Sequence, residues 1–230
     1  MDDRVDALDW ERIAAEVEAH GVGRTGALLT REECAALATS YDGEGFRSRI
    51  VMARHGFGSG EYKYFADPLP AVVAGLRQAV YPHAARIANG WAERLGAEPY
   101  PDAMVGMRER CRAAGQDKPT PLLLKYGPGD YNCLHQDLYG AVAFPLQLVV
   151  LLTDPSEFEG GELVLTEQRP RMQSRAEVVT LARGEGALFA TSERPRRGTK
   201  GEYRVRMRHG VSRLRAGHRM TLGVIFHDAA

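Results

Sequence analysis

Cysteine is scarce in this chain of 230 residues, and Cys34, Cys111 and Cys133 lie far apart in the sequence. An odd number of cysteines without a C-x-x-C spacing argues against a disulfide framework and against a zinc ribbon. We therefore expect small buried thiols. Cys133 stands apart because it is expected on the inward face of the same strand as His135, a candidate metal ligand discussed below.

Long apolar runs are absent as well. No stretch of about 18 apolar residues occurs, and no basic and then apolar leader follows Met1. We therefore expect a cytoplasmic protein. No linker rich in Pro, Gly and Ser and no internal repeat divides the chain, and its length suits one well-buried core. The prediction is a single domain over residues 1–230.

Net charge is also lacking, since 30 Lys and Arg balance 30 Asp and Glu, but the charges are unevenly placed. Residues 1–20 are mainly acidic, whereas residues 194–208 are mainly basic. This asymmetry concerns partners rather than fold, and it points to a polyanionic substrate near the C-terminal half. A solvated, charge-rich hairpin is the alternative. The candidate substrate contacts are Arg169 and Arg171, in a second basic segment at residues 168–175, and Arg196 and Arg197, in the segment at residues 194–208.

The hydrophobic pattern divides the chain into two parts. Residues 1–115 are expected to be mostly helical, with helices at 6–19, 71–80, 82–95 and 102–114 and a capping box formed by Thr30 and Glu33. From Pro121 the period changes to two, and turn residues separate short runs at 122–126, 147–152, 162–165, 178–181, 187–190, 203–208 and 220–226. The pattern predicts an α+β protein in which supporting helices precede a sandwich or small barrel at residues 120–228.

Residues 41–65 are rich in glycine and aromatic side chains, with a strand expected at 46–52. Long loops in compact domains are often functional. Tyr62 and Tyr64, with Phe57 and Phe65, could stack against a flipped base or cover a pocket. Core aromatics beside a turn are an equally good interpretation.

A His-x-Asp motif, His135–Gln136–Asp137, follows a Pro–Gly turn in the strand region. In a strand, residues i and i+2 point to the same face, so His135 and Asp137 could bind one metal ion. His209, before the Gly210 turn after another strand, offers a third ligand. Two histidines and one carboxylate with open coordination positions form the facial triad of non-haem Fe(II) oxygenases. A structural or non-catalytic metal is the alternative.

Arg219 begins the last expected strand, on the same face as Thr221. A buried guanidinium needs an anionic partner, and the distal carboxylate of 2-oxoglutarate would accept a bidentate pair of hydrogen bonds from it. Tyr126 could donate a phenolic hydrogen bond to the same carboxylate. An ordinary salt bridge is the alternative for Arg219. The other single histidines are expected to be surface or core residues, namely His55, His83, His218 and His227.

The motifs resemble those of a known superfamily. Lys125–Gly129, Leu134–Asp137 and His209–Gly217 with Arg219 downstream resemble AlkB-type Fe(II)/2-oxoglutarate nucleic-acid dealkylases, and Phe158–Leu163 resembles the prolyl-hydroxylase branch. The chain is also similar over nearly its whole length to a bacterial group described as predicted oxygenases acting on damaged DNA. The segments that carry this closer likeness are Gly56–Pro70, Gly115–Leu122, Asn132–Tyr139, Gly160–Arg175 and His209–Asp228.

The resemblance implies a double-stranded β-helix, or jelly-roll, core that uses Fe(II), 2-oxoglutarate and O2. It implies His135, Asp137 and His209 as iron ligands, and Arg219, with Tyr126 and Thr221, as the 2-oxoglutarate contacts. Leu124 departs from the pattern, because AlkB-type enzymes typically have an asparagine there that helps to bind the cosubstrate. The AlkB substrate lid also has no clear counterpart in the N-terminal third.

Three functions follow from these motifs. The first is a dioxygenase that couples decarboxylation of 2-oxoglutarate to hydroxylation or oxidative dealkylation of damaged nucleic acid, as in DNA repair. The second is a protein or amino-acid hydroxylase of the prolyl type. The third is a non-catalytic, cupin-like metal-binding domain, which would have no need of Arg219.

Overall fold

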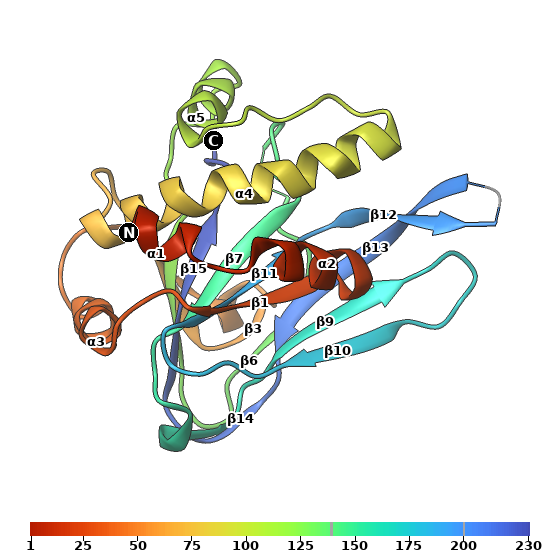
Figure 1. Ribbon diagram of the computed structural model, residues 1–230. Coiled ribbons are helices and arrows are strands. Elements are labelled where there is room, and N and C mark those ends of the chain that lie inside the picture. Colours follow the sequence, from red (N-terminus) through yellow and green to blue (C-terminus); the bar gives the residue numbers. More distant parts are fainter. Residues whose placement is uncertain (139, 200) are drawn as a thin grey trace.

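The computed structural model describes residues 1–138, 140–199 and 201–230, and its centre is a pair of antiparallel sheets (Figure 1). The larger sheet contains, in order of pairing, β1 (Val22–Ala27), β11 (Glu185–Ala190), β7 (Leu146–Leu151), β15 (Arg219–Ile225), β5 (Leu122–Tyr126), β4 (Glu61–Phe65) and β2 (Phe46–Val51). The smaller sheet contains β10 (Arg175–Val179), β9 (Leu163–Gln168), β13 (Gly201–Val211), β6 (Tyr131–His135) and β3 (Gly58–Ser59), with β12 (Glu193–Gly198) also paired to β13. A third pair joins β14 (Leu214–Gly217) and β8 (Phe158–Gly160). The α+β class with a jelly-roll core is confirmed.

Five α-helices in the described part of the chain accompany the sheets, and the longest crosses the outer side of the larger sheet (Figure 1). They are α1 (Asp2–Asp6), α2 (Trp10–His20), α3 (Arg31–Ser40), α4 (Ala71–Leu95) and α5 (Met104–Ala113), beside the short 3-10 turns η1 (Met52–Arg54) and η2 (Pro155–Glu157). The predicted capping box is present at the start of α3, where Thr30 accepts a hydrogen bond from the Glu33 amide and Glu33 accepts one from the Thr30 amide. No helix within the described ranges has the length and hydropathy needed to span a membrane.

The prediction of two helices around Pro82 was wrong, since α4 continues through this residue. A proline inside a helix removes one hydrogen bond and costs about 3 kcal/mol. Buried residues on both sides of Pro82, including Leu76, Val80 and Ala85, form one continuous apolar face of α4 in the main core. Burying that face contributes more than the proline costs, because each large apolar side chain contributes about 1.5–3 kcal/mol.

The N-terminal part supplies strands as well as helices. β1 pairs with β11 at one edge of the larger sheet, and β4 pairs with β5 near the other edge. β1 has no alternating apolar pattern, and its sequence therefore did not indicate a strand. The close packing of β1 against α2 requires the glycine at position 23, because a Cβ atom there would lie 2.6 Å from the carbonyl oxygen of Ile13 in α2. The expected mostly helical segment 1–115 is thus built into both sheets.

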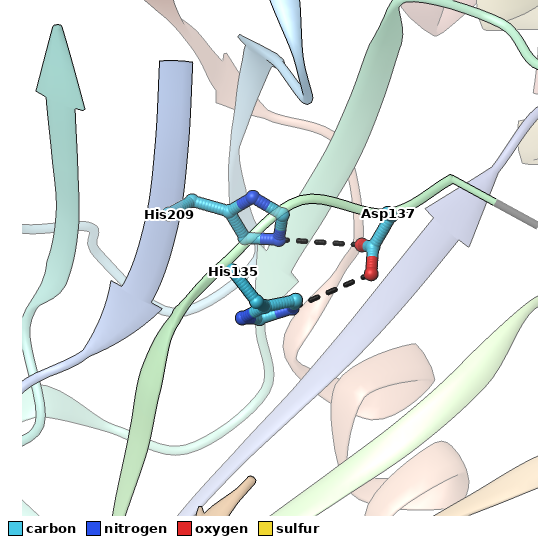
Figure 2. Close-up of side chains that lie close together, drawn as sticks. All are labelled: His135, Asp137 and His209. Carbon is cyan, nitrogen blue, oxygen red and sulfur yellow. Dashed lines mark ion pairs between the residues drawn. The ribbon is translucent and has the colours of Figure 1, made fainter. Parts of the chain in front are cut away.

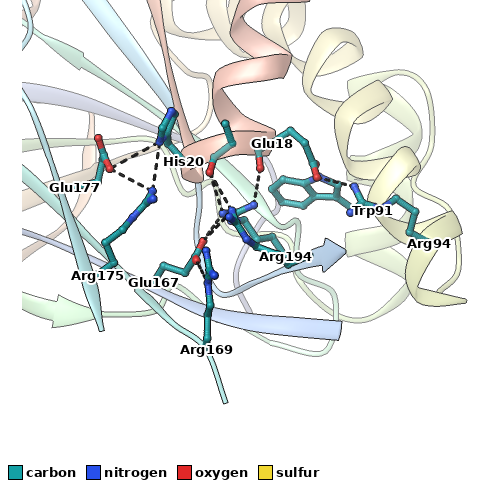
Figure 3. A network of polar contacts seen from close by, with 11 residues as sticks. Glu18, His20, Trp91, Arg94, Glu167, Arg169, Arg175, Glu177 and Arg194 are labelled. Carbon is teal, nitrogen blue, oxygen red and sulfur yellow. Dashed lines mark hydrogen bonds and ion pairs between the residues drawn. The ribbon is translucent and has the colours of Figure 1, made fainter. Parts of the chain in front are cut away.

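A buried ionic network fastens the helices to the smaller sheet (Figure 3). Glu167 on β9 and Arg194 on β12 form an ion pair in which the side chains are 3% and 0% exposed. Arg169 Nε donates to Glu167 Oε1 at 2.8 Å, and Arg194 Nη1 donates to the carbonyl oxygen of Glu18 in α2 at 2.7 Å. The Glu18 carboxylate in turn accepts a hydrogen bond from Trp91 Nε1 of α4 at 3.0 Å. Burial raises the pKa of Glu167, but Arg169 and Arg194 outweigh it and lower the pKa below its usual value.

Glu167→Gln should destabilise the protein by about 3–5 kcal/mol, because it leaves the buried Arg194 guanidinium without a charged partner. Since the folded-state pKa of Glu167 is lowered, its contribution is present above the unfolded value of about 4.3 and is lost as the pH falls through the folded value. Urea unfolding at several pH values measures both effects. Glu177→Gln, in a more exposed pair with Arg175, is the control and should cost less than about 1 kcal/mol. Equal costs for the two variants would contradict the prediction.

Candidate metal and cosubstrate site

His135, Asp137 and His209 converge although their sequence positions are far apart (Figure 2). The antiparallel register of β6 and β13 places His135 directly opposite His209. Asp137 Oδ1 lies 3.4 Å from His135 Nε2, and Asp137 Oδ2 lies 3.2 Å from His209 Nε2. One ligand atom from each residue lies within 4.8 Å of the others. The expectation that His135 and Asp137 share one face of a strand was wrong. β6 ends at His135, and Asp137 lies in the loop that follows.

Asp137 and His209 favour the protonation states that a divalent metal requires. Burial raises the pKa of Asp137, but the two histidines outweigh it and hold the pKa well below its usual range, so the carboxylate is ionised. Burial lowers the pKa of His209, which favours the neutral imidazole. Burial also acts to lower the pKa of His135, but the contact with Asp137 outweighs it and raises the pKa. His135 Nδ1 lies 2.8 Å from the carbonyl oxygen of Cys133, so Nδ1 carries the hydrogen and Nε2 faces the centre of the triad.

Gln136, between two of these residues, fixes the loop to the strand that carries the third. Its Nε2 atom donates hydrogen bonds to the carbonyl oxygens of Met207 at 2.8 Å and Ser192 at 2.9 Å. Met207 is two residues before His209 on β13. The amide therefore sets the distance between the His135–Asp137 segment and His209. Sequence reasoning missed this role, because no sequence pattern indicates which backbone groups a side-chain amide will contact.

A cavity of about 340 Å³ lies between the sheets, and the triad forms part of its wall. Arg219, Thr221 and Tyr126 also line it, as expected from the alternation along β15 and β5. Leu222, Val224 and Phe226 point to the opposite side, into the main core. The three expected metal ligands and the three expected cosubstrate contacts therefore surround one space.

Arg219 is a buried cation without an ion-pair partner among the described residues. Its side chain is 4% exposed, its Nη1 atom has no hydrogen-bond partner, and its guanidinium lies 5.9 Å from the centre of the Tyr126 ring. Burial lowers the pKa of Arg219, and Tyr126 and Glu162 act in the opposite direction. The Glu162 carboxylate accepts its hydrogen bond from Ser212 instead. Because an unpaired buried charge costs several kcal/mol, the cavity fits an anionic ligand such as a carboxylate.

Gly161 provides the space that Arg219 occupies. Its φ angle is +68°, and a Cβ atom there would lie 2.9 Å from Arg219 Cδ and 2.9 Å from Leu214 Cδ1. Gly160, with a φ angle of +80°, has no room for a Cβ atom either, because the carbonyl oxygen of Arg213 would be 2.4 Å away. The Phe158–Leu163 motif thus packs closely against the Arg219 side chain and helps to fix its position.

The aromatic segment 56–65 contributes to the cavity wall. Tyr62 and Tyr64 line it with their rings in edge contact at 5.4 Å, and Phe57 lies at its rim with 47% of its surface exposed. Phe65 is instead buried in the main core. Leu124 lines the cavity beside Thr221, so no amide is present at this position.

The basic residues lie outside the cavity lining and differ in accessibility. Arg171 and Arg197 are exposed, whereas Arg169 and Arg196 are half-buried, and each lies within 4 Å of Glu167. Arg194, in the same basic segment, is fully buried and cannot contact a polyanion. Tyr139 and Lys200, which belong to segments named above, lie outside the described residues.

Two further expectations concern other side chains. Cys34 and Cys111 are buried, whereas Cys133 is exposed and lines the cavity. His227 is a core residue, since it is fully buried and its Nδ1 atom accepts a hydrogen bond from the Phe144 amide at 3.2 Å.

Three comparisons agree with this geometry. A family model described as "Oxygenase, catalysing oxidative methylation of damaged DNA" matches residues 60–229. Two uncharacterised proteins, from two strains of Mycobacterium tuberculosis, are each 48% identical over 168 residues, which cover 72% of this chain and 72% of each relative.

Solved structures share the fold. A 2-oxoglutarate–Fe(II) oxygenase family oxidoreductase from Burkholderia pseudomallei has a TM-score of 0.57 at 14% identity, covering 96% of this chain and 92% of its own. A Pseudomonas putida prolyl-4-hydroxylase has a TM-score of 0.53 at 14% identity, covering 96% and 99% respectively.

The family match and the His-Asp-His centre define an oxygenase with a facial triad typical of non-haem Fe(II) enzymes, and its fold is that of the 2-oxoglutarate–Fe(II) oxygenases named above. Within this class, the chain belongs to the family of oxygenases whose model matches residues 60–229. Membership of an oxygenase family supports an enzyme rather than the non-catalytic, cupin-like alternative.

Gln136→Leu should weaken Fe(II) binding about 10- to 100-fold, because residues that orient metal ligands typically contribute that much. Anaerobic titration calorimetry with Fe(II) measures the affinity. Gln78→Leu, at an exposed position of α4, is the matched control and should bind Fe(II) like the wild type. An unchanged affinity in a folded Gln136→Leu protein would show that the amide does not position the ligands.

Gly161→Ala should raise the dissociation constant of 2-oxoglutarate about tenfold or more, because the added methyl group displaces Arg219. Fe(II) affinity should change much less. Gly129→Ala is the control, since Gly129 also has a positive φ of 93° but no atom within 4 Å of the added Cβ. Anaerobic titration of each Fe(II)-loaded protein with 2-oxoglutarate gives the comparison, and equal losses in both variants would assign the effect to backbone strain alone.

Proposed function

We propose that this oxygenase acts on alkylated or otherwise damaged nucleic acid, with iron held by His135, Asp137 and His209 and 2-oxoglutarate held by Arg219. The observation that carries the assignment of the site is the buried Arg219 guanidinium, which lacks an ion-pair partner among the described residues and faces the same cavity as the triad. Tyr126 and Thr221 are the proposed lesser contacts to the cosubstrate.

When bound, Fe(II), 2-oxoglutarate and O2 together supply an oxidant for a substrate C–H bond, and the cosubstrate leaves as succinate and carbon dioxide. The role of the protein is to bind the metal and the cosubstrate, to orient them, and to shield the reaction from water. The ionised Asp137 and the two imidazoles provide three ligands and leave other positions open. Arg219 neutralises the distal carboxylate, and the apolar walls, including Leu124, Val149 and Phe189, exclude water from the reaction.

Damaged DNA is the proposed substrate because the family description names it and because arginines lie on the accessible side of the smaller sheet. Arg204, Arg206 and Arg208 are exposed on β13, alternating with the buried Val205, Met207 and His209. With Arg171 and Arg197 they form an exposed basic group that could contact phosphates. Tyr62 and Tyr64 are the proposed contacts to a base, and Arg169 and Arg196 are weaker candidates because Glu167 partly neutralises them.

The purified protein with Fe(II), ascorbate and O2 should convert 2-oxoglutarate to succinate, and methylated single-stranded DNA should stimulate the conversion with release of formaldehyde. His135→Ala should abolish succinate formation. Arg219→Ala should raise the dissociation constant of 2-oxoglutarate about 100-fold, since it removes one partner of a buried charge pair.

Unmethylated DNA of the same sequence and a mixture of cell-lysate proteins are the comparison substrates. Stimulation by the proteins alone would favour the protein or amino-acid hydroxylase and contradict a nucleic-acid substrate. A wild-type protein that binds Fe(II) but never forms succinate would contradict the proposed site.

A further inference from the structure

Gln147 is a polar residue in a strand that is otherwise apolar and fully buried. The sequence of β7 is Leu–Gln–Leu–Val–Val–Leu, and all six residues are buried. Gln147 is 7% exposed, and its Oε1 atom has no hydrogen-bond partner among the described residues. An unpaired buried acceptor costs about 1–3 kcal/mol, whereas an apolar residue of similar size would cost nothing of this kind. Because the amide is costly for stability, we infer that it has a functional role.

The amide faces the catalytic cavity. Its register partners are Ile225 on β15 and Phe189 on β11, which line the same cavity and offer no polar side chain. The Phe189 ring lies 4.7 Å from the ring of His209. Gln147 therefore lies directly opposite Phe189, which contacts a proposed iron ligand. A hydrogen-bond donor for Gln147 Oε1 has to come from the cavity.

Gln147 and Arg219 lie at opposite ends of the cavity. Ile225, the partner of Gln147, is six residues from Arg219 along β15, a distance of about 20 Å in an extended strand. A five-carbon dicarboxylate that is held by Arg219 is far shorter than this. Gln147 is therefore placed to contact the substrate rather than the cosubstrate.

We propose that Gln147 is a specificity-determining residue that hydrogen-bonds the exocyclic group next to the alkylated ring nitrogen of the substrate base. This inference rests on the proposed nucleic-acid function. In a base alkylated at a ring nitrogen of its Watson–Crick edge, at least one carbon next to that nitrogen carries an amino or keto group, so this group lies close to the reacting carbon. A primary amide has both a donor and an acceptor and can meet either group by turning over.

The test uses single-stranded oligonucleotides of one sequence that carry N3-methylcytosine or N3-methylthymine, which differ in the exocyclic group at C4, amino or keto. Steady-state formaldehyde release gives kcat/KM for each. Gln147→Leu should lower kcat/KM for both about 3- to 10-fold, as expected for one lost hydrogen bond. Gln147→Glu can only accept at this position when ionised, so it should retain N3-methylcytosine and discriminate against N3-methylthymine by at least about tenfold more than the wild type does.

The ratio of the two kcat/KM values is the decisive readout, because a purely structural role would lower both values equally. Gln78→Leu should leave the ratio unchanged. If Gln147→Glu does not fold, Gln147→Leu, which introduces no charge, decides by comparison with succinate formation in the absence of DNA: the proposed role lowers kcat/KM for both oligonucleotides but leaves that basal rate unchanged, whereas a structural role lowers it as well. Wild-type kcat/KM values in a Gln147→Leu protein, or an unchanged ratio in a folded Gln147→Glu protein, would overturn the role of Gln147 but leave the nucleic-acid function intact. Failure of the wild type to oxidise either oligonucleotide while it forms succinate would instead overturn the nucleic-acid function, and with it the role of Gln147.

Discussion

The register between β6 and β13 is the constraint on which the site depends. It sets His135 opposite His209 and is followed by a shift between His209 and Val211. Gly210 makes this approach possible, because a Cβ atom there would lie 2.6 Å from the carbonyl oxygen of Asn132. A slip by one residue would turn His209 to the outer face, where Arg204, Arg206 and Arg208 lie. The Gln136 amide opposes such a slip, since its two hydrogen bonds require the carbonyl oxygens of Ser192 and Met207 to stay together.

A second register sets the far end of the cavity. β15 lies between β5 and β7, so Arg219 stands opposite Tyr126 and Thr221 opposite Leu151. The guanidinium therefore emerges inside the protein, where hydration cannot compensate for its charge. Gly161 allows this position by leaving room for the arginine side chain. The cost of burying the charge is offset when an anion binds, which makes affinity for an anion a consequence of the fold rather than of a single contact.

The sequence predicted features that depend on local periodicity or on residue chemistry. The two faces of the strand from Arg219 and the capping box at Thr30 follow from short-range patterns, whereas the three metal ligands were named from their residue types and from the resemblance to a known superfamily. It did not predict β1, whose order comes from pairing with β11, or the continuity of α4 through Pro82, which depends on packing over both halves of the helix. Arg194 was grouped with a basic surface segment, yet Glu167, from another strand, holds it in the interior. These outcomes depend on contacts between distant segments, which a single sequence does not encode locally.

Buried polar side chains at this site differ in whether other protein groups form hydrogen bonds with them. Those that have protein partners fix the geometry of the site, and those that lack them are candidates for binding a ligand. The Gln136 amide nitrogen is paired with backbone carbonyls and so fixes geometry. Arg219 Nη1 and Gln147 Oε1 lack hydrogen-bond partners within the described part of the chain, and so each favours a ligand with complementary chemistry. Leu124 offers no hydrogen bond beside Thr221, so the proposed polar contacts to the cosubstrate are Arg219, Tyr126 and Thr221. Gln147 Oε1 is a buried acceptor without a hydrogen-bond partner among the described residues, and its strand position lies away from Arg219. We therefore propose that the end of the cavity at Arg219 binds the carboxylate of the cosubstrate and that the end at Gln147 contacts the substrate.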